Sequence, residues 1–430
     1  MIETVDLQEY KAFCFRGEGR CNIVISAKGR INNSRIVWRL TKKRRSNLIN
    51  FKPKCGVIHK YMEQFIAPFL NDNYLLKTRL VNISSDKLHH LAKIPSLSKI
   101  HKIEDFNELI SYPSEFSRFP YKSHNCCVKV LALEMSDATQ IPHSNAYYFG
   151  PTITLEIKPK QGFDIPFCNN CILQIEKWKS ANFSSMYDYC PLDLFSGVRS
   201  KMEYALASLI YDPHRNLRIF VDGNSIHDNS NSPKNFDEKG LSELLFPNIP
   251  NANIQTFIKT ITCILAGIND DQIPQFSLQQ NCVLSDLLNA QKIDNIGIVR
   301  AYELYKGLPQ NIQRELQKRS NLLDRGLDFL YKTDARSLVE RYLLAATMKD
   351  CSLMISIRLV DRTVDITESN DFVRVHALNG QTLHFDFSVR IVDLDPKTGK
   401  NLENAYSRFM AGISLIKNNP NVHRSCNKNY

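Results

Sequence analysis

The N-terminal third of the chain places hydrophobic and polar residues in the short alternating runs that are typical of β-strands. The segment 13–29 alternates on both sides of a glycine-containing turn, and 35–40 is a short apolar run. Two later runs are also predicted strands, namely 127–135, which is apolar, and 152–163, which ends in a proline and a glycine. Helical spacing is seen over 58–70. The pattern therefore predicts a β-rich N-terminal part.

From residue 198 onward, hydrophobic residues recur mainly at the three- and four-residue spacing of helices. A helix is predicted over 198–211, and it precedes a hairpin over 216–226 with Asp-Gly at its tip. After a polar segment, 227–240, that is predicted to be a loop, further helices follow, and strand alternation then returns near the end. These helices are predicted over 254–267 (closed by Gly267), 283–291, 298–307 and 337–350, and the strands over 352–360 and 383–395.

Composition narrows the class of protein without naming it. The 430 residues suffice for two or three domains, and 43% hydrophobic with 23% charged residues excludes wholesale disorder. No apolar run approaches the roughly 20 residues of a membrane span, and the first ten residues carry acids without an apolar core. We therefore expect an intracellular protein whose 12 cysteines are reduced.

The positive charge is concentrated in one region. The net charge is +11, and between Glu18 and Glu63 there are twelve lysines or arginines and no acidic residue, with the densest run at 42–45. Such a field attracts polyanions, so nucleic acid, an anionic membrane and a small phosphorylated substrate are all candidates, beside a plain solvated face or a nuclear address. Zinc-finger spacing, an aromatic RNA-binding pattern and a basic region with heptads are absent from the sequence.

Two features near the N-terminus could bind phosphate groups. Gly17 and Gly19 flank a turn that continues through Arg20, Cys21 and Asn22 between two predicted strands. Glycines allow backbone N–H groups to approach phosphate oxygens, although most such triplets are simple turns. About twenty residues later, Arg39 lies in an apolar strand, where kinases place the lysine that pairs with nucleotide phosphates; an ordinary edge charge is the alternative.

A lysine-rich strand end adds a second possible phosphate site. Strand alternation would put Glu156, Lys158 and Lys160 on one face. Two ammonium groups on one face repel each other unless an anion lies between them, but an exposed edge strand protected by lysines would look the same.

Acidic residues near the C-terminus suggest catalytic or metal-binding roles. Asp350 lies at a predicted helix-to-strand junction with apolar residues on both sides. It is either a structural hydrogen-bond acceptor or a carboxylate whose pKa is adjusted by its surroundings. Asp393 and Asp395 would share one face of a strand end, where carboxylates and phosphate oxygens together suit Mg²⁺. An acidic turn is the alternative.

In combination, these motifs resemble the inositol-pentakisphosphate 2-kinases. "EIKPK", "YCPLDLFSG", "KDCSLMI" and "VDLDPK" follow the glycine turn in that family's order, over about residues 13–400. The resemblance implies ATP-dependent phosphorylation of inositol 1,3,4,5,6-pentakisphosphate at the 2-hydroxyl, giving the hexakisphosphate, phytate. It also implies an α+β fold of two lobes, distantly like a protein kinase. The expected division is an N-terminal nucleotide-binding lobe, 1–133, and a C-terminal lobe, 134–430, with a helical inositide-binding insertion at about 228–345.

The resemblance also assigns roles to individual positions. Asp350 is the expected acid–base or orienting residue, and Asp393 the expected Mg²⁺ ligand with Asp395 in reserve. The adenine-reading hinge would fall near 134–137. The expected nucleotide-binding positions are Gly19, Arg20, Cys21, Asn22, Arg39, Glu134, Asn216, Arg218 and Asp393, and the expected substrate-binding positions are Arg44, Lys158, Lys160, Lys177 and Lys397.

Some family features have no secure match in this chain. Plant relatives hold a structural zinc with two histidines and two cysteines, but 235–345 offers only Cys263 and Cys282 and no histidine, so no zinc is expected. Cys168 and Cys171 are predicted to be a lone pair of free thiols. Candidates for the remaining family positions are Lys400, Tyr406 and Arg408 after the last lysine, and Arg118 or Lys122 for an arginine expected between 71 and 125.

The expected ligands are ATP, Mg²⁺ and the pentakisphosphate, with no stable nucleic-acid partner and no membrane. We expect a monomer in the nucleus and cytoplasm, with the basic run 42–45 used for substrate rather than import. The alternative is a non-catalytic inositide- or nucleic-acid-binding protein that uses the same basic surface. Such a binder would not need a nucleotide loop, a metal-binding carboxylate pair and a candidate base together.

Overall fold

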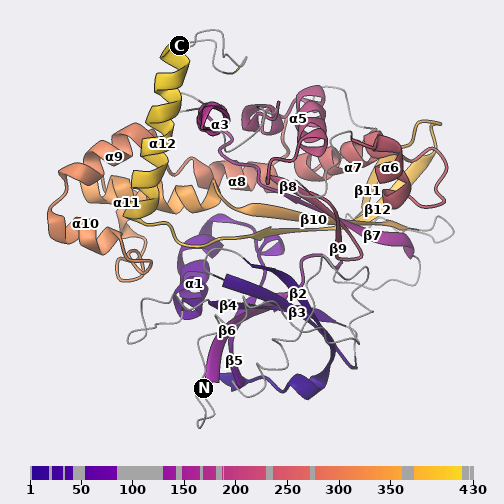
Figure 1. Cartoon of the computed structure of the whole chain (residues 1–430), viewed down its shortest axis with the longest axis horizontal. Helices are drawn as coiled ribbons and strands as arrows, with labels where there is room; N and C mark the ends of the chain where they lie inside the picture. The colour runs from indigo at the N-terminus through magenta and orange to yellow at the C-terminus, as the bar shows by residue number, and fades with distance from the viewer. Residues whose placement is uncertain are drawn as a thin grey trace.

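The computed structural model describes most of the chain, and its two sheets come from separate parts of the sequence (Figure 1). The described residues are 2–18, 22–31, 34–41, 54–84, 129–141, 148–164, 168–180, 186, 188–228, 236–271, 277–360, 372–418 and 426. The predicted basic run 42–45 and much of the segments 71–125 and 227–240 lie outside them. No helix in the described part is both long and apolar enough to cross a membrane.

The first sheet has the strand order β1-β5-β6-β4-β3-β2. Its strands are β1 (Glu3–Thr4), β2 (Tyr10–Glu18), β3 (Asn22–Gly29), β4 (Arg35–Thr41), β5 (Thr78–Ser84) and β6 (Lys129–Ser136). Neighbours are antiparallel except β1 and β5. The alternation seen in the sequence buries Ile25, Trp38 and Val81 in one small core, which is what gives this sheet its register.

The second sheet is antiparallel throughout, in the order β11-β12-β10-β7-β8-β9. Its strands are β7 (Tyr148–Ile157), β8 (Leu217–Val221), β9 (Asn224–His227), β10 (Ser352–Val360), β11 (Phe372–His376) and β12 (Thr382–Val392). Strand β10 is central and almost wholly buried, as its continuous apolar run predicts. The predicted hairpin is confirmed, because Asp222 and Gly223 turn between β8 and β9 with φ of 50° and 84°.

Helices cover the second sheet on the side away from the first (Figure 1). The described chain between β9 and β10 contains helices and no strand. The α-helices are α1 (Cys55–Tyr61), α3 (Asn169–Lys179), α4 (Pro191–Leu194), α5 (Arg199–Tyr211), α6 (Glu238–Leu245), α7 (Ile254–Ala266), α8 (Val283–Gln291), α9 (Gly297–Gly307), α10 (Gln310–Leu316), α11 (Ala335–Met348) and α12 (Gly399–Asn418). Short 3₁₀ turns occur at Leu7–Glu9, Ala67–Phe69, Asp72–Tyr74 and Asp328–Tyr331, and one π turn at Met62–Ile66.

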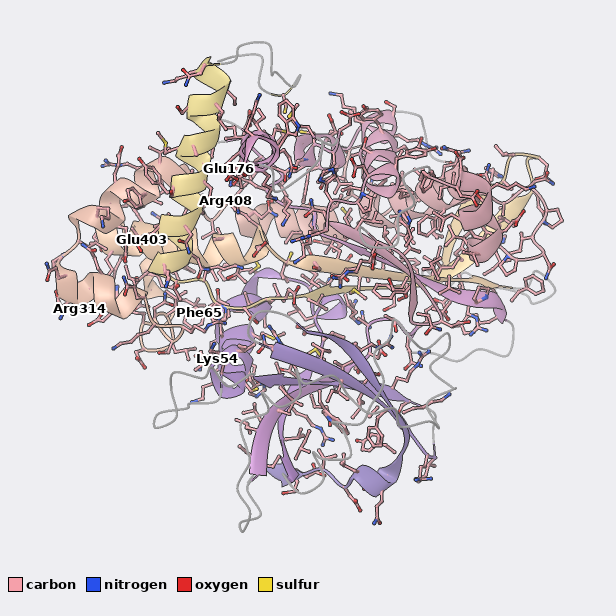
Figure 2. The ribbon with its side chains drawn as sticks, viewed as in Figure 1. Lys54, Phe65, Glu176, Arg314, Glu403 and Arg408 are labelled. Atoms are coloured by element: carbon pink, nitrogen blue, oxygen red, sulfur yellow. The ribbon has the colours of Figure 1, made fainter. Side chains whose placement is uncertain are left out.

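Helix α1 and the turn after it connect the two halves of the molecule. Tyr61 and Phe65 belong to the large core beneath the second sheet, where Phe65 stacks on Phe329. The Tyr61 hydroxyl lies 3.0 Å from the Thr347 hydroxyl of α11. Phe65 therefore sits where the first sheet meets the helical part (Figure 2). This contact fixes the two sheets against each other.

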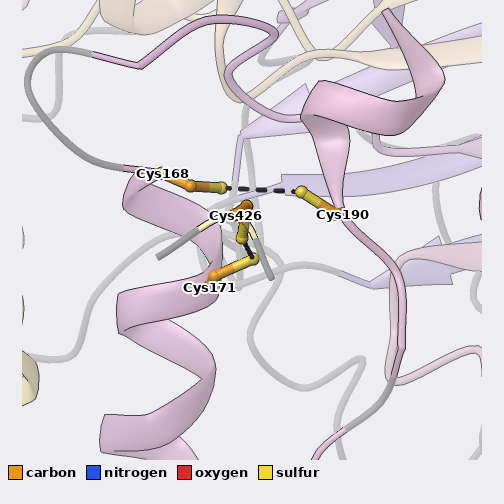
Figure 3. Close-up of side chains that lie close together, drawn as sticks. All are labelled: Cys168, Cys171, Cys190 and Cys426. Atoms are coloured by element: carbon orange, nitrogen blue, oxygen red, sulfur yellow. Dashed lines mark hydrogen bonds between the residues drawn. The ribbon is translucent and has the colours of Figure 1, made fainter. Parts of the chain in front are cut away.

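Sulfur atoms form a small separate cluster at the start of α3. Cys168 and Cys171 meet Cys190, and Cys426 packs against them from beyond α12 (Figure 3). The prediction that Cys168 and Cys171 form a lone pair is therefore wrong. Cys190 comes from the start of α4, and Cys426 follows α12, which packs on α3.

Most predicted elements are confirmed, with differences at their ends and near the C-terminus. The helix closed by Gly267 is present, with that glycine at φ 74°. Strand β12 ends at Val392, so the predicted strand 383–395 is too long. Helices α3 and α12 were not predicted. The structure is an α+β protein of two sheets, which confirms the predicted class.

Candidate active site between the two sheets

A cavity of about 410 Å³ lies between the two sheets, with apolar walls on both sides. Val24, Val37 and Leu133 come from the first sheet, and Phe220 and Met354 from the second. Two apolar walls that face each other suit a flat aromatic group, because both of its faces can leave water. One end of the cavity is lined by 135–139, the segment that leaves β6 toward the second sheet.

Charged and polar residues also line the cavity, and most of them were singled out from the sequence. They come from both sheets: Asn22 and Arg39 from the first, and Glu156, Lys158, Asn216, Arg218 and Asp393 from the second and its flanks. All the predicted nucleotide positions that the structure describes therefore line one cavity, except Glu134. Topology brings them together from segments more than 300 residues apart.

Glu134 points away from the cavity. Its carboxylate accepts a hydrogen bond from the Trp38 indole at 2.9 Å and pairs with Arg79. Its neighbours Leu133 and Met135 line the cavity instead, as strand alternation requires. The predicted nucleotide contact near Glu134 concerns backbone groups of the hinge, so it stays a prediction, and the Glu134 side chain itself does not line the cavity.

Arg39 of the first sheet forms an ionic contact with the segment that follows β12 of the second sheet. Its guanidinium donates two hydrogen bonds to the Asp395 carboxylate, at 2.6 and 2.7 Å, and Arg319 also lies 3.4 Å from Asp395. Burial opposes ionisation of Asp395, but Arg39 and Arg319 outweigh it and lower the pKa of that carboxyl. A carboxylate held by two arginines offers poor access to a metal ion, so Asp395 is unsuited to the reserve role predicted for it.

Asp393 is more open. Its carboxylate is 51% exposed and lies 3.4 Å from the ammonium group of Lys158. The strand ends one residue earlier, and Asp393 takes a left-handed backbone at φ 63°. The prediction that Asp393 and Asp395 share a strand face is therefore wrong. A non-glycine residue held at positive φ costs free energy, and such strain concentrates at functional sites.

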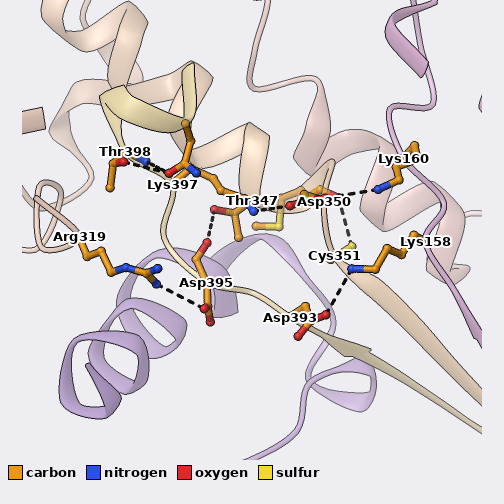
Figure 4. Close-up of polar contacts among 12 residues, drawn as sticks. Lys158, Lys160, Arg319, Thr347, Asp350, Cys351, Asp393, Asp395, Lys397 and Thr398 are labelled. Atoms are coloured by element: carbon orange, nitrogen blue, oxygen red, sulfur yellow. Dashed lines mark hydrogen bonds and ion pairs between the residues drawn. The ribbon is translucent and has the colours of Figure 1, made fainter. Parts of the chain in front are cut away.

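Asp350 lies between two lysines (Figure 4). Lys397 Nζ is 2.5 Å from one carboxylate oxygen and Lys160 Nζ is 3.4 Å from the other. Burial would raise the pKa of Asp350, but Lys160 and Lys397 outweigh it and lower that pKa well below its usual range. Lys160 also has a left-handed backbone, at φ 62°. Asp350 is thus kept ionised by cations on both sides.

Lys158 and Lys160 do not share one face as predicted, because β7 ends at Ile157. Lys158 faces the cavity and Asp393, whereas Lys160 faces Asp350. Burial lowers the pKa of Lys158, but Asp393 and Asp350 outweigh it and raise that pKa, which places this ammonium under the influence of both carboxylates. Lys158 therefore lies on the cavity side of the site, and Lys160 lies on the Asp350 side.

Lys177 and Arg408 extend the positive charge beyond Asp350. Burial, followed by repulsion from Lys160 and Arg408, lowers the pKa of Lys177 to about 8. Arg408 pairs with Glu176 at 2.8 Å, across the α3–α12 contact seen in Figure 2. Among the other candidates, Tyr406 stacks on Tyr302 with ring centroids 3.8 Å apart, and Lys400 is exposed. Gly19, Arg20, Cys21, Arg44, Arg118 and Lys122 lie outside the described residues.

Sequence reasoning missed residues that hold the site in place. Arg16 of β2 pairs with Asp137 at 2.5 Å and donates a hydrogen bond to the Gly223 carbonyl of the second sheet. Burial opposes ionisation of Asp137, but Arg16 and Arg35 lower its pKa to about 2. The sequence signals were an arginine before the glycine turn and an aspartate after β6, each too common to interpret alone.

Two polar side chains hold the backbone of the lysine segment. The Tyr189 hydroxyl donates a hydrogen bond to the Pro159 carbonyl at 2.7 Å. The Gln291 amide donates to the Lys160 carbonyl and accepts from the Gly162 N–H, both at 2.8 Å. Tyr189 and Gln291 are buried, so these bonds exclude water from the segment that carries both lysines.

The arrangement is suited to handling several phosphate groups at once. An apolar slot leads to Asp393 and Lys158, and then to Asp350 among further lysines. Phosphoryl transfer needs mainly alignment of the reactants and neutralisation of charge. A half-exposed carboxylate at the slot's edge also provides an oxygen ligand for Mg²⁺ alongside phosphate oxygens.

Comparison with known proteins gives a consistent result. The family described as inositol-pentakisphosphate 2-kinase matches residues 15–408. A protein of that name from Danio rerio is 27% identical over 340 residues, covering 63% of this chain and 68% of that protein. Its namesake from Arabidopsis thaliana is 31% identical over 276 residues, covering 60% of this chain and 58% of that protein. The match therefore spans less than two thirds of the plant protein.

Proposed function

The chain belongs to the inositol-pentakisphosphate 2-kinase family, and we propose that it transfers the γ-phosphoryl group of ATP to the 2-hydroxyl of inositol 1,3,4,5,6-pentakisphosphate. The products are the hexakisphosphate and ADP. The observation that carries the proposal is the sequence of groups along the cavity. An apolar slot ends at one open carboxylate, Asp393, and a second carboxylate, Asp350, lies just beyond it among lysines.

The apolar slot accepts the adenine ring in this proposal, and the two sheets act as lobes that close on ATP in the manner of a protein kinase. The segment 135–139 would read the base edge through its backbone groups. Arg39, Asn216 and Arg218 line the cavity and would contact the ribose and phosphates. For Arg39 this contact competes with Asp395, so ATP binding would loosen one link between the sheets.

Asp393 is suited to bind magnesium because its carboxylate is half exposed. The ion pair that it forms with Lys158 is long, at 3.4 Å. Asp393 would hold a magnesium ion together with ATP, and that ion would supply positive charge against the negative charge that develops during transfer. Lys158 would remain beside the same phosphates. Lys158 and Asp393 therefore position the group being transferred.

Asp350 orients the 2-hydroxyl of the inositol ring in this proposal. Its low pKa in the absence of ligand makes it a weak base. Substrate phosphates compete for Lys160 and Lys397, the same lysines that hold Asp350 ionised. Binding of the pentakisphosphate would therefore release the carboxylate to accept the hydroxyl's hydrogen bond and raise its basicity when the proton must leave.

Lys160, Lys177 and Lys397 bind the inositol phosphates. They come from three separate segments, so they can contact different phosphates around one ring. Burial, followed by repulsion from Lys160 and Arg408, depresses the pKa of Lys177, and a bound polyanion would relieve that repulsion. Charge-assisted bonds of this kind contribute about 1.5–3 kcal/mol each.

The proposal is tested by incubating the protein with labelled ATP, Mg²⁺ and the pentakisphosphate and separating the products by anion exchange. We expect label in a hexakisphosphate fraction, formed with one ADP per transfer, and strongly reduced transfer with Asp350→Asn. Lys239→Ala, a change at an 88% exposed lysine of α6, is the control and should behave as wild type. Tight binding of the pentakisphosphate without any transfer would instead support the non-catalytic binder.

A further inference from the structure

The side chain of Gln291, the last residue of helix α8, contacts both of the segments that carry Lys160 and Asp350. These two segments follow different elements, β7 and α11, and their charged side chains meet at 3.4 Å (Figure 4). In the proposed function, Asp350 orients the hydroxyl and Lys160 binds a phosphate of the same ring. The separation of the two segments therefore bears directly on the reaction.

Pairing within the second sheet does not reach these two residues. In the described chain, the ladder between β7 and β10 ends at the pair formed by Ile157 and Leu353. Lys160 lies three residues after Ile157, and Asp350 lies three residues before Leu353. Lys160 also has a left-handed backbone at φ 62°, which costs free energy for a residue with a side chain. Contacts other than the ladder must therefore hold both residues.

The Gln291 amide connects the two segments where the ladder stops. Its nitrogen donates hydrogen bonds to the Lys160 carbonyl at 2.8 Å and to the Met348 carbonyl at 3.2 Å, and its oxygen accepts the Gly162 N–H at 2.8 Å. Met348 is the last residue of α11 and lies two positions before Asp350. Gln291 is fully buried, so water cannot replace these hydrogen bonds if the amide is removed.

A second buried contact, from the turn that follows α8, holds the residue next to Asp350. The Asp294 carboxylate accepts a hydrogen bond from Lys349 Nζ at 2.6 Å, and its other oxygen accepts two backbone N–H groups at the start of α9. The Lys349 ammonium also lies over the Phe163 ring, 5.0 Å from its centroid. The end of α8 and the turn after it thus contact both segments twice.

We propose that Gln291 is a positioning residue for phosphoryl transfer, which holds the Lys160 and Asp350 segments at the separation that the transfer requires. This inference rests on the proposed function. Because Gln291 is buried, it acts through backbone groups rather than by contact with substrate. Glutamine suits this role, since one planar amide donates two hydrogen bonds and accepts a third.

Gln291→Met tests the proposal, because methionine keeps the length of the side chain but forms none of these hydrogen bonds. A displacement of about 1 Å can cost about 10²-fold in rate, so kcat should fall by about 10- to 100-fold. The dissociation constants of ATP and the pentakisphosphate should stay within about threefold of wild type, because every cationic side chain is still present. Gln291→Asn, whose amide is too short to reach both segments, should behave in the same way and gives the answer if Gln291→Met does not fold.

Gln313→Met is the matched control. The Gln313 amide also donates hydrogen bonds to two backbone carbonyls, those of Lys306 and Leu308, but it joins α9 to α10 and does not line the cavity. This variant loses the same kind of contact, so it should show a comparable loss of stability on chemical denaturation. Its kcat should nevertheless equal that of wild type.

Hydrogen exchange of the ligand-free full chain gives a readout that does not depend on any reaction. Gln291→Met should raise exchange in peptides that cover 158–163 and 347–351, while the ladder between β7 and β10 stays protected. Gln313→Met should leave both peptides unchanged.

Unchanged exchange in either peptide of Gln291→Met would overturn the proposal, whether or not the protein is a kinase. A kcat within about twofold of wild type, or equal losses of kcat in Gln291→Met and Gln313→Met, would overturn it as well. Wild-type protein that transfers no phosphate would instead refute the proposed function. The exchange result would then still confirm or overturn the connection that Gln291 makes between the two segments.

Discussion

At the scale of single residues, charge pairing between lysines and carboxylates sets the state of the site. Lys397 and Lys160 hold Asp350, and Lys158 holds Asp393. The lysines are mostly shielded from solvent but the two carboxylates are about half exposed, so a polyanion can replace the carboxylate partner. The ligand-free arrangement therefore keeps the lysines in place for phosphates that the substrate brings.

Substitution of the two carboxylates should produce different defects. Asp350→Asn keeps the shape but loses the charge, so kcat should fall by about 10²- to 10⁴-fold while ATP and pentakisphosphate still bind. Asp393→Asn removes a metal ligand and should raise the Mg²⁺ concentration needed for half-maximal activity. A Mg²⁺ titration of activity beside direct binding measurements separates the two. If high Mg²⁺ rescued Asp350→Asn but not Asp393→Asn, the roles would have to be exchanged.

The depressed pKa of Lys177 predicts a pH dependence of substrate binding. With a pKa of about 8, this lysine is charged at pH 7 and mostly neutral at pH 9 in the free protein. Pentakisphosphate affinity should therefore fall by about tenfold between these pH values, since the proton must be taken up on binding. Lys177→Arg stays charged throughout and should show a much smaller fall by calorimetry. Identical pH profiles for the two proteins would contradict the assignment.

At the scale of elements, the segment after β7 is the part that the rest of the fold supports most closely. The Lys158 N–H donates to the Asn216 carbonyl at 2.8 Å, and Tyr189 and Gln291 hold the following carbonyls. This support fixes the backbone positions from which the Lys158 and Lys160 side chains extend. Their charge can therefore act at defined positions rather than as a diffuse field.

Removing either of these lysines should be costly. Lys158→Ala and Lys160→Ala should each lower kcat/KM by about 10- to 100-fold, the equivalent of one charge-assisted bond in a partly closed site. The loss should persist in moderately raised salt, because these side chains are mostly shielded from solvent. Lys239→Ala is the matched exposed control. Equal, salt-sensitive losses in all three would show that only the general positive field matters.

Hydrophobic patterning predicted elements whose buried positions are apolar, and it failed where they are not. Strands β3, β4 and β10 and helices α7 and α8 bury mostly apolar residues, and the buried serines and threonines among them are small. Helix α3 buries Asn170 and Gln174, which interrupts its amphipathic pattern. Helix α12 buries Gly399 and Gly412. Only glycine fits at these positions, because Tyr305 and Ile172 occupy the space that a side chain would need. Their packing partners were not readable from the sequence.

At the scale of the whole molecule, a few polar contacts join the first sheet to the second. Arg39 reaches Asp395, Arg16 reaches the Gly223 carbonyl, and Tyr61 meets Thr347. Two of these three contacts involve residues that line the cavity. Closure of the sheets and binding in the cavity should therefore be coupled.

The Arg39–Asp395 pair offers a direct test of that link. Arg39→Ala and Asp395→Ala should each lower the free energy of unfolding by about 1–3 kcal/mol, because each leaves a partly buried charge without its main partner. The double variant should lose less than the sum, by about 1 kcal/mol or more, in a cycle measured by chemical denaturation. Asp395→Asn should leave the Mg²⁺ requirement unchanged, unlike Asp393→Asn. Additive losses would show that the pair is not coupled.

Most residues of the candidate site could be predicted from the sequence, but their arrangement in space could not. The motifs singled out Arg39, Lys158 and Asp393, which line one cavity, and Asp350, which lies beyond it beside Lys160. Strand geometry alone misplaced Asp395 and Lys160, because both strands end earlier than alternation suggests. The four-cysteine cluster was missed because Cys426 lies 236 positions after Cys190 in the sequence. Long-range packing decides such contacts, and periodicity carries no information about it.

The structure of the reaction product tests the central claim most directly. Wild-type protein is incubated with ATP, Mg²⁺ and inositol 1,3,4,5,6-pentakisphosphate, and the purified product is examined by phosphorus and proton NMR. The account predicts a single hexakisphosphate that carries its new phosphate ester on the axial 2-position, formed more slowly but without change of position by Asp350→Asn. A pyrophosphate signal, a new ester at any other position, or unchanged substrate despite tight binding would contradict it.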